Sequence, residues 1–407
     1  MKQFDIPEFY RSPIIAKVKA KRKVDDPRKQ DFSPTFLPFS KVTFVLPRHF
    51  GFCYGVENAI EKSYLSLKEN PGKRIFLLSE MIHNPAVNED LQAHGIQFLQ
   101  STSGEELIPL ASLTSDDIVI IPAFGTTLEI EEKLRETGAN IESYNTTCPF
   151  VEKVWNRAQK LGDTDHTIII HGKHSHEETR ATFSHSQAKA PSLIIKNMQE
   201  AQFLGEVIKK EQSSEAFYQY FDGKYAPGFD PSLHLSKIGV VNQTTMLATE
   251  TQEITDYLRQ IMIDVHGEAQ IKQHMADTRD TLCYATNDNQ SSTYALAATK
   301  PDMALVIGGS NSSNTTHLVE ILEATTPTFF ITDEQAIESL DWIHSYNIHN
   351  HKVERIPFFK PKAPLHIALT SGASCPDAMV DRVMLRLLAL IEEPVSIEEA
   401  LHATFNP

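Results

Sequence analysis

Short apolar runs that alternate with amphipathic stretches constrain the fold of this 407-residue chain more than any other feature. The runs are rich in Val, Ile, Leu and Phe and nearly continuous, which is typical of parallel strands buried on both faces. Stretches with a helical spacing of apolar residues lie between many of them, for example 56–69, 129–136 and 151–161. This alternation predicts α/β domains with mainly parallel sheets. The runs are 42–46, 74–78, 117–121, 167–170, 193–195, 238–241, 304–307, 328–331 and 366–369.

The length predicts two or three domains, each with its own core. The segment 211–236 is aromatic and polar without clear periodicity, so it favours an insertion or a long loop. The basic run 17–23 could be a nucleic-acid or targeting patch, but a solvated or loosely packed arm is the commoner outcome for a short charge run. We expect an N-terminal arm (1–40), a first α/β domain (41–148, completed by 385–407), a second (149–280, with an insertion near 205–236) and a third (281–384).

Composition excludes several classes of protein. There are 38 Lys and Arg against 53 Asp and Glu, which gives a net charge of −15. A chain this acidic is a poor candidate for binding nucleic acid or anionic membranes broadly. No apolar run reaches the roughly 18 to 20 residues of a membrane helix, and the charged N-terminus does not resemble a signal or transit peptide. We therefore expect a cytoplasmic protein that is a monomer or a homodimer.

The four cysteines are the most informative local feature. None has a Cys-x-x-Cys neighbour, and each stands after a strand or turn and just before a helical stretch. A helix N-terminus lowers the pKa of a thiol, and ligands collect at the carboxyl ends of parallel strands. Cysteines from separate domains could thus share an iron–sulfur, zinc or copper(I) site. The alternative is four buried cysteines that act as small hydrophobic residues. They are Cys53, Cys148, Cys283 and Cys375.

Polar clusters follow several of the same strands. The turn 307–315 offers hydroxyl and amide donors that could hold a phosphate, although Ser and Asn are also the usual helix-capping residues. Hydroxyl groups recur after buried strands in 242–245 and 369–374. The segment 171–178 could bind zinc through three histidines, or an anion with Glu178 as the proton donor. A lone His83 is more often structural, but polar clusters at four strand ends favour one shared site.

Eight short motifs follow one another along the chain, at residues 51–56, 82–85, 146–151, 176–178, 243–245, 281–286, 309–314 and 371–374. Each motif is weak by itself, whereas eight in order between about residues 42 and 385 are highly specific. Together they resemble the 4-hydroxy-3-methylbut-2-enyl diphosphate reductase (IspH/LytB) family. The length, the N-terminal arm and the segment 122–125 resemble the longer branch found in plants and cyanobacteria.

The resemblance implies three similar α/β domains around a central [4Fe–4S] cluster. Three cysteines match the family's ligands, which would leave one iron open to the substrate's hydroxyl group: Cys53, Cys148 and Cys283. Glu178 matches the catalytic acid, and Thr244 matches a hydroxyl group that relays protons. Matches to substrate-binding positions are His83, His176, Gln243, Thr245, Ser312, Ser313, Asn314 and Ser374.

The implied reaction is the reductive dehydroxylation of (E)-4-hydroxy-3-methylbut-2-enyl diphosphate to isopentenyl and dimethylallyl diphosphate. This is the last step of the non-mevalonate isoprenoid route. Two electrons would come from an external donor such as ferredoxin or flavodoxin, and no nucleic acid or membrane partner is expected. Two other classes are a non-redox hydro-lyase of the aconitase type, which needs no reductant, and a non-catalytic cluster or zinc protein that senses redox state or iron.

Two positions depart from the family pattern. Phe124 stands where many members carry a histidine, so one diphosphate donor is missing, and Lys173 or His174 could compensate. Cys375 stands where a small residue is usual. As a fourth ligand it would close the cluster, and a packed thiol is the other interpretation.

Overall fold

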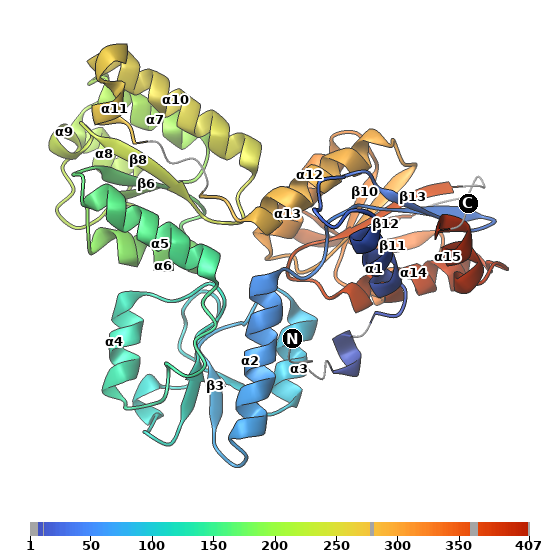
Figure 1. Ribbon diagram of the computed structural model, residues 1–407. Coiled ribbons are helices and arrows are strands. Elements are labelled where there is room, and N and C mark those ends of the chain that lie inside the picture. Colours follow the sequence, from blue (N-terminus) through green and yellow to red (C-terminus); the bar gives the residue numbers. More distant parts are fainter. Residues whose placement is uncertain (1–6, 11, 277–280, 359–364, 406–407) are drawn as a thin grey trace. The chain divides into compact units, whose positions relative to one another are not determined.

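The structure is a computed structural model that describes residues 7–10, 12–276, 281–358 and 365–405. The chain divides into two compact units (Figure 1). Unit 1 consists of Met1–Tyr54, His83–Ala86 and Tyr284–Pro407, and unit 2 of Gly55–Ile82 and Val87–Cys283. No helix in the described ranges is both long and apolar enough to cross a membrane. The expected compartment and oligomeric state stay predictions.

Unit 1 is built on a five-stranded sheet in the order β1-β2-β13-β9-β10. All neighbours are parallel except β1 and β2, and an antiparallel pair, β11 and β12, forms a separate ribbon. The strands are β1 (Thr35–Pro38), β2 (Val42–Leu46), β9 (Met303–Ile307), β10 (Thr328–Ile331), β11 (Trp342–Asn347), β12 (Lys352–Pro357) and β13 (Leu365–Ser371). The helices are η1 (Glu8–Tyr10), α1 (Ile15–Asp25), α12 (Tyr284–Ala298), α13 (Ser313–Glu323), η4 (Glu334–Ala336), α14 (Asp377–Leu390) and α15 (Ile397–Phe405).

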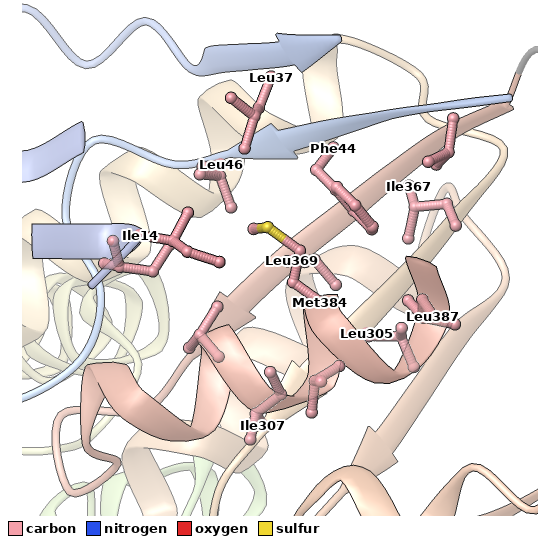
Figure 2. Packing of buried hydrophobic residues seen from close by; sticks show 14 of the residues in the cluster. Ile14, Leu37, Phe44, Leu46, Leu305, Ile307, Ile367, Leu369, Met384 and Leu387 are labelled. Atoms are coloured by element: carbon pink, nitrogen blue, oxygen red, sulfur yellow. The ribbon is translucent and has the colours of Figure 1, made fainter. Parts of the chain in front are cut away.

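Both faces of this sheet are covered by helices, which explains why its central strands are apolar throughout. Phe44 and Leu46 point toward α1 and α14, where Ile14 and Met384 complete the core shown in Figure 2. Val45 points the other way and packs with the apolar face of α12 and α13. Residues that alternate along one strand thus serve two separate cores.

Unit 2 carries two three-stranded parallel sheets, in the orders β4-β3-β5 and β7-β6-β8. The strands are β3 (Ile75–Leu77), β4 (Gln97–Phe98), β5 (Ile118–Ile120), β6 (Thr167–His171), β7 (Ser192–Ile195) and β8 (Ile238–Asn242). The helices are α2 (Tyr54–Glu69), α3 (Pro85–Ala93), η2 (Leu110–Ser112), α4 (Leu128–Glu136), α5 (Pro149–Gly162), α6 (Glu177–Gln187), α7 (Met198–Ile208), α8 (Ser214–Tyr220), α9 (Pro231–His234), α10 (Ala248–His266), η3 (Glu268–Gln270) and α11 (Ile271–His274).

The second sheet of unit 2 is sandwiched between two helical layers. Ile169 packs with apolar residues of α7 and α10, whereas Ile168 and Ile170 pack with α5 and α6 (Figure 1). Loops at the carboxyl ends of β6 and β8 run directly into α6 and α10. Because β6 and β8 are parallel neighbours, those two loops meet at one edge of the sheet.

The predicted alternation of strands and helices is confirmed, and the fold is a mixed α/β fold with mainly parallel sheets. The segment 211–236, expected as an insertion or a long loop, folds in part into α8 and α9. Phe217, Phe221 and Phe229 are almost fully buried, with Phe217 and Phe229 stacked at 5.3 Å between ring centroids. The aromatic residues therefore serve the α7–α10 core, and burial rather than helical periodicity explains their pattern.

Two further differences concern the ends of the chain. The expectation of a solvated or loosely packed N-terminal arm is wrong for the described part, because α1 buries Ile15 and Val18 and its Lys19 contacts Phe50 and Asp377. The strand β2 pairs with β13 of unit 1 and not with β3, so the segment 41–54 groups with the C-terminal third. The segment 385–407 also lies in unit 1, and the expected boundary at 280 falls outside the described residues.

Candidate active site

Each predicted cluster ligand stands immediately before a helix. Cys53 precedes α2, Cys148 is the N-cap of α5, and Cys283 precedes α12. Their backbone N–H groups donate to carbonyl oxygens of neighbouring loops, at 3.3 Å for Cys53 to Ala373, 3.0 Å for Cys148 to Ala123 and 3.4 Å for Cys283 to Thr244. Cys53 belongs to unit 1 and the other two to unit 2. Among the described residues no group of three or more His, Cys, Asp or Glu side chains is placed to hold a metal.

Glu178 and Thr244 form the most distinctive polar contact of unit 2. Glu178 lies in the first turn of α6 and is only 1% exposed. Its two carboxyl oxygens each receive a hydrogen bond from Thr244, from the backbone N–H at 2.5 Å and from the hydroxyl at 2.9 Å. This double contact joins the loop after β6 to the loop after β8. A carboxyl group and a hydroxyl group predicted from sequence to handle protons are therefore in direct contact.

Burial raises the pKa of Glu178 from 4.5 to about 7. The two hydrogen bonds from Thr244 favour the carboxylate and lower the pKa, but the loss of hydration outweighs them. A carboxyl group with this pKa is half protonated near neutral pH, which is what a general acid requires. The environment of Glu178 therefore suits proton donation.

Gln243 braces the same edge of the sheet. Its side-chain oxygen accepts hydrogen bonds from the Lys173 N–H at 3.2 Å and the Thr179 hydroxyl at 3.0 Å. Its amide nitrogen donates to the Thr245 hydroxyl at 2.7 Å. Gly172 has no room for a side chain, because an added Cβ would lie 2.7 Å from the Thr179 hydroxyl. The network fixes the loop that carries Thr244.

His176 is the N-cap of α6, and its orientation is determined by the helix that follows. Its Nδ1 accepts a hydrogen bond from the Glu178 N–H at 3.2 Å, so the ring proton of the neutral imidazole sits on Nε2. Phe124 packs edge-on against this ring, with 5.5 Å between centroids. The residue that departs from the family pattern is thus in contact with His176. His174 is exposed, and compensation by Lys173 or His174 stays a prediction.

The three histidines of the segment 171–178 do not converge on a zinc site. The Nδ1 of His171 lies 3.0 Å from the Thr251 hydroxyl, His176 faces Glu178, and His174 is exposed. The anion-and-acid alternative is therefore the one that the local geometry favours.

Unit 1 gathers a different set of groups at the carboxyl ends of β9 and β13. Ser312 is the N-cap of α13, and its hydroxyl oxygen lies 3.3 Å from both the Thr315 N–H and the Ser374 hydroxyl. The segment His83–Ala86 joins this cluster, since the Ser374 hydroxyl also lies 3.3 Å from the His83 carbonyl oxygen. Asn84 donates to the Ser374 carbonyl oxygen at 2.9 Å. Hydroxyl and amide groups from three distant segments thus meet.

His83 has the same protonation pattern as His176. The Asn311 side-chain nitrogen lies 3.2 Å from the His83 Nδ1. An amide nitrogen can only donate, so Nδ1 accepts and the ring proton sits on Nε2. Gly309 makes this approach possible, because a Cβ there would lie 2.3 Å from the His83 carbonyl oxygen. Both predicted histidines therefore carry their proton on Nε2.

Asn314 contains the clearest unsatisfied group in this cluster. Its side-chain oxygen accepts from the Ala373 N–H at 2.8 Å, which fixes the amide. Its amide nitrogen is buried and has no hydrogen-bond partner among the described residues, and the residue is only 2% exposed. A buried donor without a partner is costly, so a bound acceptor would satisfy it. Together with the N-terminus of α13, this donor favours an anion.

Cys375 is a packed thiol. It is fully buried in the core of unit 1, where its sulfur lies 3.7 Å from the Pro376 carbonyl oxygen and 3.9 Å from the Met379 sulfur. Burial strongly raises the pKa of the Cys375 thiol, which opposes the thiolate form that a metal needs. This local environment argues against a fourth ligand.

Several site residues were not singled out from the sequence. Asn311 and Asn84 lie within motifs that were noticed, but nothing in the pattern showed that they contact His83 and Ser374. Thr179 follows the predicted acid, and only the tertiary fold turns it toward Gln243. The predicted residues fall into two sets. Unit 1 holds Cys53, His83, Ser312, Ser313, Asn314 and Ser374, and unit 2 holds Cys148, His176, Glu178, Gln243, Thr244, Thr245 and Cys283.

Comparison with known proteins identifies the family of the chain. The family model described as "LytB protein" matches residues 44–388. A 4-hydroxy-3-methylbut-2-enyl diphosphate reductase of Parasynechococcus marenigrum (strain WH8102) is 38% identical over 357 residues, covering 88% of each chain. A protein of the same name from Trichormus variabilis is 37% identical over 350 residues, covering 86% of this chain and 85% of its own.

Solved structures show the same fold. A structure of the E-1-hydroxy-2-methyl-but-2-enyl-4-diphosphate reductase from Plasmodium falciparum has a TM-score of 0.60 at 21% identity, covering 88% of this chain and 89% of its own. A structure of (E)-4-hydroxy-3-methyl-but-2-enyl diphosphate reductase has a TM-score of 0.52 at 22% identity, and the match covers 86% of this chain and 99% of that chain. The mixed α/β fold and the relatives at 37–38% identity thus define an α/β reductase. The chain belongs to the LytB family, which confirms the resemblance and the enzyme class drawn from the motifs.

Proposed function

We propose that this protein reduces (E)-4-hydroxy-3-methylbut-2-enyl diphosphate to isopentenyl and dimethylallyl diphosphate. The observation that carries the proposal is the buried Glu178, whose pKa of about 7 and double contact with Thr244 suit a general acid, in a member of the LytB family. The net reaction replaces a C–O bond by a C–H bond and releases water. It consumes two protons and two electrons.

The diphosphate is held by the neutral donors of unit 1. Ser312, Asn314 and Ser374 offer hydroxyl and amide groups at the N-terminus of α13, and His83 offers its Nε2–H. Hydrogen bonds to a charged acceptor are about twice as strong as neutral ones, so neutral donors suffice. The unsatisfied amide of Asn314 supports this assignment, and Ser313, Gln243 and Thr245 stay predicted contacts.

Glu178 delivers the proton that converts the departing hydroxyl group into water. Thr244 contacts both carboxyl oxygens, so its hydroxyl can pass the proton on or hold the acid in place. His176 adds a neutral Nε2–H donor one turn away. Because burial raises the pKa of Glu178 to about 7, about half of the side chains carry the acidic proton at neutral pH.

The chain offers three thiols that fit a [4Fe–4S] cluster. Cys53, Cys148 and Cys283 each stand at the start of a helix, where a thiolate is stabilised, and Cys375 is withdrawn into the core. When bound, such a cluster would supply single electrons and one Lewis-acidic iron for the substrate's oxygen. The electrons would come from a ferredoxin or flavodoxin.

The test is anaerobic turnover of the reconstituted full chain with reduced methyl viologen, followed by mass spectrometry of the products. We expect both allylic and homoallylic diphosphates, formed only with reductant. Turnover without reductant would instead indicate a hydro-lyase. A cluster without affinity for the diphosphate would indicate a redox or iron sensor.

A further inference from the structure

The loop between β2 and Cys53 is enclosed by the N-terminal segment of the chain. Four contacts join the two, and all lie within unit 1. Arg48 donates to the Asp26 carbonyl oxygen at 3.1 Å, and His49 packs against Phe32 with 5.6 Å between ring centroids. The next two contacts are Lys19 on Phe50 and Tyr10 on Phe52, the latter at 6.0 Å between centroids.

Lys19 makes the strongest of these contacts. Its ammonium group donates to the Phe50 carbonyl oxygen at 2.7 Å and to the Asp377 carboxylate at 2.7 Å. The same nitrogen lies 4.5 Å from the centre of the Phe50 ring. One side chain therefore ties the loop before Cys53 to the start of α14. Because its side chain is only 31% exposed, water competes weakly for these contacts.

Gly51 shows that the loop is shaped to receive this pair. Its φ of +75° is a left-handed conformation that favours glycine. A Cβ at this position would lie 2.1 Å from the Asp377 oxygen and 3.2 Å from the Lys19 nitrogen. The absence of a side chain at Gly51 is therefore what allows Asp377 and Lys19 to approach the loop.

The helix that carries Lys19 is itself firmly held. The buried Asp381 of α14 accepts hydrogen bonds from the Ile14 and Ile15 N–H groups, both at 3.0 Å, and from the Ser12 hydroxyl at 2.8 Å. Ile15 and Val18 belong to the same core as Phe50. All of α1 lies before residue 44, where the match to the family model begins. A helix outside the matched region, α1, thus contacts the loop before Cys53, which lies inside that region.

We propose that this N-terminal clamp, defined as Tyr10, Lys19, Asp26 and Phe32, positions Cys53 for cluster binding, with Lys19 as its central positioning residue. The inference rests on the proposed function in so far as Cys53 is a cluster ligand. The clamp restricts the loop before Cys53, so it slows the exposure of the thiol and the loss of iron. Removing the ammonium group loosens the loop without touching the thiol.

The test compares Lys19→Met with Lys21→Met, which removes a matched lysine from the exposed Lys21–Asp25 pair of the same helix. The first readout is the rate at which maleimide alkylates Cys53 in the full chain without iron, with Cys148 of unit 2 as the internal reference. We expect about fivefold faster alkylation of Cys53 in Lys19→Met, the scale of a modest shift in local opening. We expect no change in the alkylation rate of Cys53 in Lys21→Met, and none in the rate of Cys148 in either variant.

The second readout is the rate of iron release to a chelator from the reconstituted full chain. It rises about fivefold in Lys19→Met by the same loosening of the loop. Lys19→Arg restores most of both rates, because it keeps the charge and the donors. Asp377→Asn, which keeps the acceptor, gives an intermediate rate.

An unchanged rate at Cys53 in a folded Lys19→Met, judged by circular dichroism, would overturn the clamp. Equal acceleration at Cys53 and Cys148 would also overturn it, because it would show general destabilisation. Failure to bind iron would count against the proposed function alone, since the alkylation rates need no cluster.

Discussion

The carboxyl ends of the strands in the two units carry opposite chemistry on the same architectural plan. Unit 1 presents hydroxyl, amide and imidazole groups, and its distinctive member is Asn314 with an unsatisfied donor. Unit 2 presents a buried carboxyl group, Glu178, whose pKa is raised to about 7. Parallel strands followed by helices place polar groups at one edge in both cases. The difference teaches that the same scaffold can present donors suited to an anion or a carboxyl group suited to a proton, according to which side chains follow the strands.

The largest effect is expected from Glu178→Gln. The amide keeps the size of the side chain but has no acidic proton, so kcat falls by about 100-fold or more, the usual range for a lost general acid. KM changes little, because the diphosphate donors of unit 1 are intact. Steady-state kinetics check both values.

The neighbouring Glu177→Gln is the matched control for that change. Glu177 accepts a hydrogen bond from the Ser79 hydroxyl at 2.5 Å, which the amide oxygen retains. We expect a loss of less than about fivefold, because no proton donor of the reaction is removed. If kcat falls equally in Glu178→Gln and Glu177→Gln, Glu178 has no special role as the acid.

Asn314→Asp tests the binding role of unit 1. It keeps the acceptor for the Ala373 N–H but replaces the unsatisfied amide with a negative charge facing the proposed anion. Diphosphate affinity is expected to fall by about 10- to 100-fold, the scale of one hydrogen bond to a charged group. Titration calorimetry with inorganic diphosphate measures it, and the exposed Asn350→Asp controls for the added charge. Retained affinity would remove Asn314 from the anion site.

The pH dependence follows from the raised pKa of Glu178. As the acid it must be protonated, so kcat/KM, which reports the pKa of the free enzyme, is expected to fall about tenfold per pH unit above about pH 7. Thr244→Val removes a hydrogen bond that lowers this pKa, so the falling limb moves to higher pH while kcat decreases. If the falling part of the pH profile stays at the same pH in Thr244→Val, a group other than Glu178 controls it.

The same pKa makes a prediction for stability. The folded state holds the proton of Glu178 up to about pH 7, whereas the unfolded state releases it near pH 4.5. Stability contributed by the neutral carboxyl is therefore present below pH 4.5 and lost as pH rises toward 7. Thermal unfolding at pH 5 and pH 7.5 should show a smaller difference in Tm for Glu178→Gln than for the wild type.

The smallest effect is expected from Asn311→Asp. A carboxylate in place of the amide accepts from His83 Nδ1, so the imidazole proton moves away from Nε2 and one donor to the diphosphate is lost. KM rises about three- to tenfold, the scale of one modest hydrogen bond. Nitrogen-15 NMR of the imidazole reports the change directly, and an Nδ1-protonated His83 in the wild type would contradict the assignment.

The parts of the fold that repeat a local pattern could be predicted from the sequence. Runs such as 304–307 are apolar because both faces of β9 are covered, and each cysteine precedes a helix as expected. The packing of α1 was missed because its charged residues outnumber the few that it buries, Ile15 and Val18. The pairing of β2 with β13 is a long-range choice that neither strand signals alone.

In the candidate site, too, the sequence predicts single residues but not the long-range contacts between them. Motifs named Glu178 and Thr244 separately, and only the parallel pairing of β6 with β8 brings them within 2.9 Å. The raised pKa of Glu178 depends on burial, which no motif encodes. Lys19 was read as one charge in a basic run, and its contact with Phe50 depends on the packing of α1.

The most direct test of the account is the Mössbauer spectrum of the full chain reconstituted anaerobically with iron-57, recorded with and without (E)-4-hydroxy-3-methylbut-2-enyl diphosphate. If Cys53, Cys148 and Cys283 hold the cluster as proposed, one iron is distinct from the rest and its signal changes when the diphosphate is added. A spectrum of equivalent irons that ignores the diphosphate would contradict the account.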